Sequence, residues 1–153
     1  MGNTTRLDDQ LCFALYSAAR AATGAYRSAL GELGLTYPQY VALLALWEED
    51  GVGVGELGQR LYLDSGTLSP LLKRLEALGL VERRRSADDE RRVRIHLTAE
   101  GKAMRKPVTR VQREIAAKVG LTAEEVTTLR TLARRLSEVA EHPDEQAHNQ
   151  GVS

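Results

Sequence analysis

The chain has 153 residues, of which 42% are hydrophobic, and this is enough for one domain with an apolar core. Its 21 basic and 21 acidic side chains balance, so overall positive charge cannot attract nucleic acid and any such contact needs a local basic patch. No apolar run follows a basic start, which argues against a signal peptide and a membrane span. A single cysteine excludes an internal disulfide framework, so we expect a cytoplasmic protein.

The first thirty residues predict a long helix, because small and apolar side chains recur at steps of three and four from Leu7 to Ala22. Pro38 is typical of the first turn of a second helix, which continues through the following leucines. Residues 50–53 form a predicted turn, and a short helix follows over about residues 54–62.

A fourth helix is predicted where leucines recur at helical spacing up to Leu78, and Gly79 closes it in the left-handed conformation. Pro70 has no backbone N–H to donate, so we expect it in the first turn of this helix. The helix cap is then expected between Ser65 and Thr67, most simply at Thr67.

The pattern next alternates between apolar and polar residues, which predicts two strands over residues 81–85 and 93–97, joined by the charged loop 86–92. Thr98 is expected to cap a helix that runs to about Val119. Two strands do not supply a broad parallel sheet, so the predicted fold class is mainly α with a small β-hairpin.

Thr122 and Glu125 form a predicted capping box for the last helix, which is expected to end near Glu141. The polar residues 142–153 are expected to be a disordered tail.

The short third helix, its tight connection and the amphipathic fourth helix form a predicted helix-turn-helix, whose second helix enters the DNA major groove. A leucine-striped helix or a charged hairpin is usually only structural, but the two in succession indicate DNA binding. Arg91 is expected to reach the minor groove, with Asp89 holding it extended and Arg92 beside it. The candidate contacts on the fourth helix are small, polar or basic: Ser65, Gly66, Thr67, Ser69, Pro70 and Lys73.

Five runs carry a resemblance to a known family: residues 57–61 (LGQRL), 64–67 (DSGT), 75–81 (LEALGLV), 88–92 (DDERR) and 97–101 (LTAEG). On these runs the chain resembles the MarR family of winged-helix transcriptional regulators. The resemblance implies a winged helix-turn-helix over residues 35–98 that binds double-stranded operator DNA as a homodimer. Residues 1–34 and 99–141 would form the helical dimerisation region, and residues 1–153 a single domain.

Cys12 lies in the first predicted helix, with Tyr16 one turn further along. A lone free cysteine is commonly a small buried hydrophobic residue, and that interpretation stays open. Together with Tyr26 and Tyr37, however, these residues resemble the organic hydroperoxide resistance branch of the MarR family. The resemblance implies that Cys12 is the peroxide-reactive thiol, that Tyr26 and Tyr37 of the other subunit hydrogen-bond to its thiolate, and that Tyr16 lines the same pocket.

The implied function is a redox-sensing repressor in oxidative stress, which binds DNA when Cys12 is reduced and releases it when an organic hydroperoxide oxidises Cys12. Without a second cysteine the chain resembles the one-cysteine type, in which a low-molecular-weight thiol forms a mixed disulfide. One alternative is a repressor relieved by a small phenolic ligand, with Cys12 only structural. The other is a thiol peroxidase, which would leave the helix-turn-helix unexplained, so we expect no enzyme.

Two motifs point elsewhere and are set aside. Residues 53–58 spell the dinucleotide-binding pattern GxGxxG, but they lie between two predicted helices instead of after a strand. The three histidines are scattered and lack a cysteine pair for zinc. We therefore expect no cofactor and no metal site.

Overall fold

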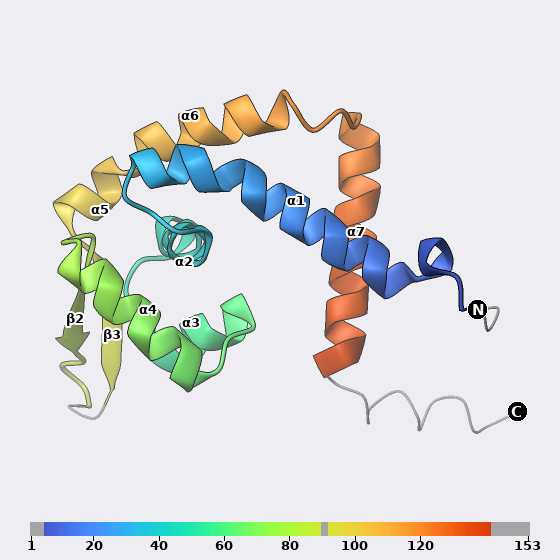
Figure 1. Ribbon diagram of the computed structural model, residues 1–153. Helices are drawn as coiled ribbons and strands as arrows, with labels where there is room; N and C mark the ends of the chain where they lie inside the picture. Colours follow the sequence, from blue (N-terminus) through green and yellow to red (C-terminus); the bar gives the residue numbers. More distant parts are fainter. Residues whose placement is uncertain (1–4, 90–91, 142–153) are drawn as a thin grey trace, which may run out of the picture. The chain divides into compact units, whose positions relative to one another are not determined.

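The computed structural model describes residues 5–89 and 92–141 (Figure 1). The chain divides into two compact units, Met1–Ala116 and Ala117–Ser153, and each is described by itself. The disordered tail expected over residues 142–153 and the role expected of Arg91 fall outside the described residues. No helix in the described part of the chain combines the length and the apolar character needed to cross a membrane.

The first unit is mainly helical and contains one small sheet, which confirms the predicted fold class. Its strands are β1 (Val52–Gly53), β2 (Val81–Arg85) and β3 (Val93–Leu97). After a 3₁₀ turn at Leu7–Asp9, its helices are α1 (Leu11–Glu32), α2 (Tyr37–Glu48), α3 (Val54–Leu61), α4 (Ser65–Ala77), α5 (Ala99–Ala103) and α6 (Arg105–Ala116).

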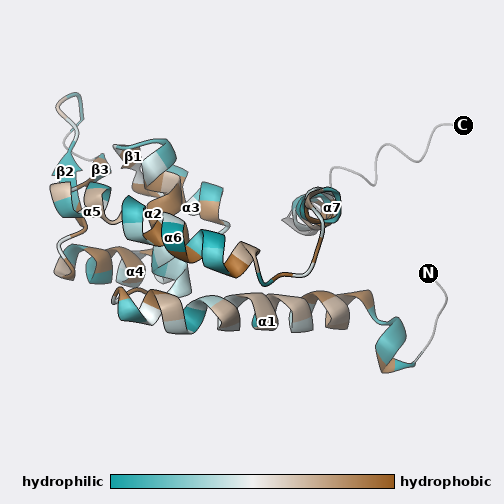
Figure 2. Ribbon diagram, turned by 90° about the horizontal axis from the view of Figure 1, so that it is seen from above, coloured by the Kyte–Doolittle hydropathy of each residue, from teal (hydrophilic) through white to brown (hydrophobic). Residues whose placement is uncertain are grey.

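Helix α2 lies in the middle of the first unit, where Figure 2 shows apolar colouring. Thr36 and Gln39 exchange hydrogen bonds in a capping box at its start, and Pro38 occupies the first turn as predicted. Helix α1 runs beside α6 in both views and also contacts α2 (Figures 1 and 2). The fully buried side chains of the core are Leu30, Leu43, Leu46, Leu57, Leu68, Leu72, Leu75, Ile95 and Val108.

The predicted hairpin is confirmed with its predicted bounds: β2 and β3 pair antiparallel, with Val81 opposite Leu97. The prediction of only two strands was wrong, because Val52–Gly53 pairs with the other edge of β3 and the sheet order is β1-β3-β2. A two-residue strand is too short to show alternation in a sequence. The turn signal of Asp50 and Gly51, whose φ is 73°, dominates this segment instead.

The predicted cap of α4 at Thr67 was wrong, because the helix begins at Ser65 and Asp64 caps it. The Asp64 carboxylate accepts the backbone N–H of Thr67 at 2.7 Å, and this bond holds the pKa of Asp64 below its usual value. Pro70 therefore lies inside the helix and not in its first turn. It cannot donate to the Gly66 carbonyl, but Gly66 is exposed, so water can bind there instead.

Thr98 caps a helix as predicted, and its hydroxyl accepts the Gly101 N–H at 3.0 Å. The single helix predicted to run to about Val119 is instead interrupted at Met104 and ends at Ala116. Pro107 supplies the reason. It lacks a backbone N–H and suits the first turn of a helix, so a new helix, α6, begins just before it.

The second unit contains α7 (Ala123–Glu141), which confirms the last predicted helix. Thr122 and Glu125 exchange the predicted capping-box hydrogen bonds, at 2.8 and 3.2 Å. The apolar side chains of α7 recur at steps of three and four, and they are exposed in the single chain: Val126, Leu129, Leu132, Leu136 and Val139. An uncovered apolar stripe of this kind is typical of a helix that packs against another chain.

Candidate functional site

Helices α3 and α4 form the predicted helix-turn-helix, joined by residues 62–64. Tyr62 ends α3 with a φ of 54°, the one positive φ at a non-glycine residue in the described part of the chain. Gly58 allows the close approach of the connection to α3, because a Cβ at this position would lie 2.9 Å from the carbonyl oxygen of Leu63. This tight connection sets the direction in which α4 leaves α3.

The N-terminal half of α4 presents most of the predicted DNA contacts to solvent. Ser65, Gly66, Thr67, Pro70 and Lys73 are exposed and Ser69 is half-buried, whereas the leucines of the opposite face are buried in the core. The Thr67 hydroxyl donates to Asp64 at 3.2 Å, which fixes that side chain at the start of the helix. Small exposed side chains allow a DNA groove to come close to the backbone of α4.

The wing, which we define as strands β2 and β3 with the loop that joins them, makes one polar contact with α4 and one with the turn that follows α4. Nε of Arg83 in β2 lies 2.9 Å from Oε2 of Glu76 in α4. The Thr98 hydroxyl, just after β3, donates to the carbonyl of Gly79 at 2.6 Å. These contacts couple the orientation of the wing to that of α4.

At the other end of the wing, Nε of Arg92 lies 3.7 Å from the Asp89 carboxylate, and the Arg92 N–H donates to the Asp89 carbonyl at 2.9 Å. The Arg92 side chain is largely exposed. The predicted pairing of Asp89 with Arg91 stays a prediction, since Arg91 lies outside the described residues.

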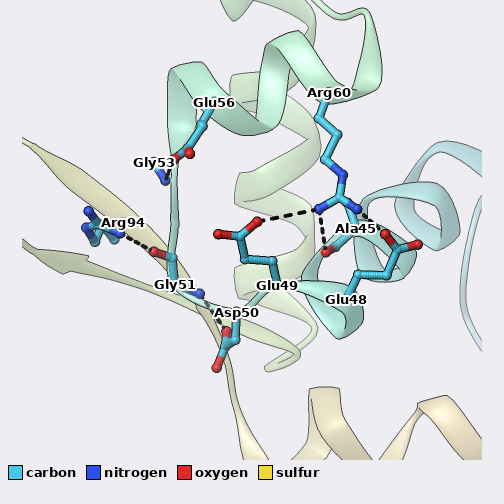
Figure 3. Close-up of polar contacts among 9 residues, drawn as sticks. All are labelled: Ala45, Glu48, Glu49, Asp50, Gly51, Gly53, Glu56, Arg60 and Arg94. Carbon is cyan, nitrogen blue, oxygen red and sulfur yellow. Dashed lines mark hydrogen bonds and ion pairs between the residues drawn. The ribbon is translucent and has the colours of Figure 1, made fainter.

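Arg60 in α3 fixes the position of the helix-turn-helix, a role that the sequence analysis missed (Figure 3). Its guanidinium reaches the C-terminal end of α2, where it donates to the Ala45 carbonyl at 3.4 Å, pairs with Glu48 and lies 4.0 Å from Glu49. A cation at a helix C-terminus is favourable because it complements the helix dipole. Helix α3 is therefore held to the end of α2.

The short strand β1 is held by polar contacts that Figure 3 shows in part. Nη1 of Arg94 donates to the Gly51 carbonyl at 2.7 Å. The Asp50 carboxylate accepts the N–H groups of Gly51 at 3.0 Å and Leu97 at 2.8 Å. The bonds of Arg94 and Leu97 attach strand β3 to Asp50 and Gly51, in the segment between α2 and α3.

Cys12 lies in the first half of α1 and is exposed, so the single chain does not bury it as a small hydrophobic residue. Its apolar neighbours Leu11 and Phe13 are exposed as well, and so is Tyr16. The Tyr16 ring carries the Arg20 guanidinium 5.6 Å from its centroid. Tyr26 is fourteen residues further along the same helix, which places it about 21 Å from Cys12 at the rise of an α-helix.

Tyr26 and Tyr37 are brought together, and Tyr40 joins them. The ring centroids of Tyr26 and Tyr37 lie 5.5 Å apart, edge to face, and those of Tyr26 and Tyr40 lie 5.3 Å apart, stacked. Tyr40 is buried, and its hydroxyl accepts a hydrogen bond from Nε2 of Gln112 in α6 at 2.8 Å. Tyr40 follows Tyr37 by three residues on α2, a spacing that could have revealed it. Gln112 offers no such local signal.

The tyrosine cluster, Tyr26, Tyr37 and Tyr40, favours protonated phenols. Burial, together with Tyr40 and Tyr37 nearby, raises the pKa of Tyr26 to about 12. Burial and the neighbouring Tyr40 also raise the pKa of Tyr37. Both hydroxyls therefore keep their protons at neutral pH and can act as hydrogen-bond donors.

A metal centre has no support in the described part of the chain, where no three His, Cys, Asp or Glu side chains gather in a way that could hold an ion.

Comparisons with known proteins agree with this architecture. A family model described as transcriptional regulator SarA/Rot matches residues 25–106. The organic hydroperoxide resistance transcriptional regulator of Bacillus subtilis is 42% identical over 133 residues, which cover 87% of this chain and 90% of that protein. The regulator TtmR of Methylorubrum extorquens is 53% identical over 119 residues. That match covers 78% of this chain but only 61% of TtmR.

Similar structures have been solved. Reduced AbfR bound to DNA has a TM-score of 0.73 at 36% identity, covering 88% of this chain and 95% of that one; AbfR is a protein of Staphylococcus epidermidis. MarR has a TM-score of 0.71 at 28% identity, covering 87% of this chain and 99% of that one.

The helix-turn-helix, the wing and these similarities define a winged-helix transcriptional regulator, which is not an enzyme. The chain belongs to the SarA/Rot family of MarR-type regulators, in the branch of the organic hydroperoxide resistance regulators, and it carries one cysteine. The family predicted from the sequence is confirmed, and membership in a family of transcriptional regulators argues against the thiol peroxidase alternative.

Proposed function

We propose that this regulator is a repressor that binds operator DNA as a homodimer while Cys12 is reduced, and releases the DNA when an organic hydroperoxide oxidises Cys12. The position of Cys12 carries the proposal. Its thiol is exposed among apolar side chains on α1, about 21 Å along that helix from Tyr26 of the same chain. A second subunit can bring its own phenols to the sulfur.

In this proposal α4 enters the major groove and the wing lies along the neighbouring backbone or minor groove. The exposed residues of α4 support this role, since Lys73 can neutralise a phosphate and the small side chains at the helix start can approach base edges. Asp89 and Arg92, with Arg91, are the proposed contacts of the wing. The solved structure of reduced AbfR bound to DNA, to which this chain is similar, supports DNA binding.

The proposed dimer uses residues 1–34 and 99–141, and residues 35–98 bind DNA. Support comes from the apolar side chains that the single chain leaves exposed. Leu7, Leu11 and Phe13 lie at the N-terminal end, and the stripe from Val126 to Val139 lies on α7. Covering such surfaces is favourable by roughly 25 cal/mol per Å² of apolar area removed from water, so these surfaces suit a permanent interface.

The proposed chemistry begins with the Cys12 thiolate, which attacks one oxygen of the hydroperoxide O–O bond. The S–O bond forms as the O–O bond breaks, the sulfur is oxidised to a sulfenic acid, and the alcohol leaves after taking up a proton. A low-molecular-weight thiol then condenses with the sulfenic acid to a mixed disulfide and water. Tyr26 and Tyr37 of the second subunit, with Tyr16 nearby, would stabilise the thiolate by donating hydrogen bonds.

Oxidation replaces an anionic acceptor by a larger, neutral group, so the phenols of the second subunit lose the partner that held them. Tyr26 lies on α1 and Tyr37 on α2, and α2 also contacts α4. A shift of these helices would change the distance between the two α4 helices of the dimer, which must match half-sites about one DNA turn apart.

A gel-shift experiment on the DNA upstream of the protein's own gene tests the proposal. Reduced protein should bind, and one equivalent of cumene hydroperoxide per subunit with a small thiol should release the DNA. Cys12→Ser should bind equally well and ignore the peroxide. Tyr26→Phe and Tyr37→Phe should bind but respond about tenfold more slowly, since each removes a hydrogen bond to a charged group. Tyr62→Phe, an exposed tyrosine outside the cluster, serves as the control for response rate.

Peroxide-driven release from the Cys12→Ser variant would exclude Cys12 as the sensor. Release by a salicylate-like phenol, without release by cumene hydroperoxide, would favour the alternative in which a small ligand relieves repression.

A further inference from the structure

A pocket of about 450 Å³ lies between the end of α2, strand β1 and helix α3, and it shares no residue with the proposed sensor site. Its floor is apolar, because it is formed by Val52 and Leu57, which are 5% and 1% exposed. Its walls are polar and exposed, and they consist of Glu49, Glu56, Gln59 and Arg60. This volume falls within the range of small-molecule sites, in which a few polar groups fix the orientation of the ligand.

The two carboxylates of this α2–α3 pocket are only partly neutralised by the chain itself. The Arg60 guanidinium pairs with Glu48 and lies 4.0 Å from Glu49. One oxygen of Glu56 accepts the backbone N–H of Gly53 at 3.2 Å. In Figure 3 the Glu49 side chain is drawn between Glu56 and Arg60. Among the residues that the structure describes, Arg60 is the one cation that lines the pocket, so the two carboxylates leave it with a net negative charge.

Two other classes of occupant fit this pocket less well. A metal ion is disfavoured, because no three His, Cys, Asp or Glu side chains in the described ranges gather in a way that could hold one. DNA would bring its phosphates next to the same carboxylates, which repel them. An organic cation with an apolar body satisfies both parts of the pocket, since its charge can lie between Glu49 and Glu56 while its body covers Val52 and Leu57.

We propose that the α2–α3 pocket binds a small organic cation, an ammonium group on an aryl or alkyl body, with the charge held between Glu49 and Glu56. Hydrogen bonds from an ammonium group to carboxylates are stronger than those between neutral groups, and covering the floor removes apolar surface from water. The site goes beyond peroxide sensing and does not depend on Cys12. Because its walls belong to α2 and α3, the bound cation would join the two helices that Arg60 already holds together.

The test uses 2-phenylethylamine, a cation at neutral pH, and the reduced full-length protein. A titration followed by amide NMR should saturate and shift the signals of residues 52–60. Two analogues should each bind at least tenfold more weakly: 2-phenylethanol, which has the body without the charge, and methylamine, which has the charge without the body. Equal binding of 2-phenylethanol, tighter binding of the anion 3-phenylpropionate, or no binding of 2-phenylethylamine would each overturn the proposal.

Substitution of the two carboxylates locates the charge of the ligand. Glu49→Gln and Glu56→Gln should each weaken the binding of 2-phenylethylamine about tenfold, because each removes the charge of one acceptor. Glutamine at position 56 still offers an oxygen to the Gly53 N–H, so the start of α3 keeps its cap. Glu114→Gln on the exposed side of α6 is the matched control and should bind like the wild type. Undiminished binding by both folded pocket variants, or an equal loss in the control, would show that the cation binds elsewhere.

Cys12→Ser separates this pocket from the proposed sensor, since it should bind 2-phenylethylamine as the wild type does. A loss of affinity in this variant would place the ligand near Cys12 and overturn the pocket. Peroxide-driven release of DNA from the same variant would overturn the proposed function and leave the pocket unaffected. A wild type that ignores 2-phenylethylamine but responds to peroxide through Cys12 would do the reverse.

Discussion

Arg83 and Glu76 join the wing to α4, with the guanidinium Nε 2.9 Å from the carboxylate oxygen. Each side chain is 32% exposed, so solvent screens the pair and its contribution to the free energy of unfolding should stay below about 1 kcal/mol. Its significance lies in geometry, because it connects the two elements proposed to contact DNA.

A double-mutant cycle with Glu76→Gln and Arg83→Met should detect this pair. We expect a coupling energy of about 0.5 kcal/mol in urea unfolding at low salt, falling at high salt as ions screen the charges. No measurable coupling at low salt would contradict the contact. The same cycle on Arg84 and Glu82, which pair within β2, provides a comparison that does not involve α4.

Gly101→Ala should strongly destabilise the fold. A Cβ at this position would lie 2.0 Å from the carbonyl oxygen of Leu80, and the Gly101 carbonyl also accepts a hydrogen bond from the Trp47 indole at 2.9 Å. Because backbone atoms on both sides must move, we expect a loss of about 3 kcal/mol in the free energy of unfolding. The control is Gly55→Ala in α3, where a Cβ would meet no atom within 4 Å.

Gly55→Ala should leave the stability unchanged or raise it by about 0.5 kcal/mol, because alanine restricts the unfolded chain and suits a helix. Equal urea midpoints for the two alanine variants would show that the approach of Gly101 to Leu80 is looser than described.

Stability should fall between pH 10 and 12, in part because of Tyr26. The unfolded chain releases this proton near the ordinary value of 10.0 and the folded chain only at about 12. In that interval the folded state binds more protons than the unfolded state, so the free energy of unfolding decreases as pH rises. The stabilisation that comes from the raised pKa of Tyr26 is fully present below pH 10. Tyr26→Phe should flatten this decrease in urea unfolding, whereas Tyr62→Phe, with its exposed phenol, should retain it.

Lys73→Met should weaken operator binding to a similar degree for all sequences. The exposed ammonium on α4 is expected to contact a phosphate, so the slope of log affinity against log salt should decrease in magnitude by about 0.9. Fluorescence anisotropy at several salt concentrations measures this slope. Lys102→Met, which removes a charge from α5, should leave the slope unchanged; an equal change in both variants would argue for a general field effect instead of a contact.

Long, strongly periodic elements were predictable from the sequence, and so were caps with a single good acceptor. Thr98 and Thr122 each cap the helix expected of them, and Gly79 has the expected left-handed φ of 70°. The start of α4 was not predictable in this way, because Asp64 and Thr67 are both good caps. In the structure the Asp64 carboxylate accepts a hydrogen bond from the Thr67 N–H, so Asp64 is the cap and Thr67 lies inside the helix.

The candidate site was predictable only where its residues lie close in sequence or follow a known pattern. The structure shows most of the predicted α4 residues exposed and the rings of Tyr26 and Tyr37 5.5 Å apart, while their roles toward DNA and the thiolate stay predictions. Gln112 and Tyr40 are 72 residues apart and meet only after α1, α2 and α6 have packed. The Arg60 contacts with the end of α2 likewise depend on how α3 folds back, which no local pattern encodes.

Cys12 and Tyr26 are fourteen residues apart on one uninterrupted helix. Their separation in sequence therefore sets the angle between them around the helix axis as well as the distance along it. Each residue turns the helix by about 100°, so fourteen bring the sulfur and the phenol nearly to the same side. One deleted residue would leave Cys12 about 140° from Tyr26 around the helix axis, on nearly the opposite face. Substitutions along this stretch leave that alignment intact, whereas a single insertion or deletion changes it at once.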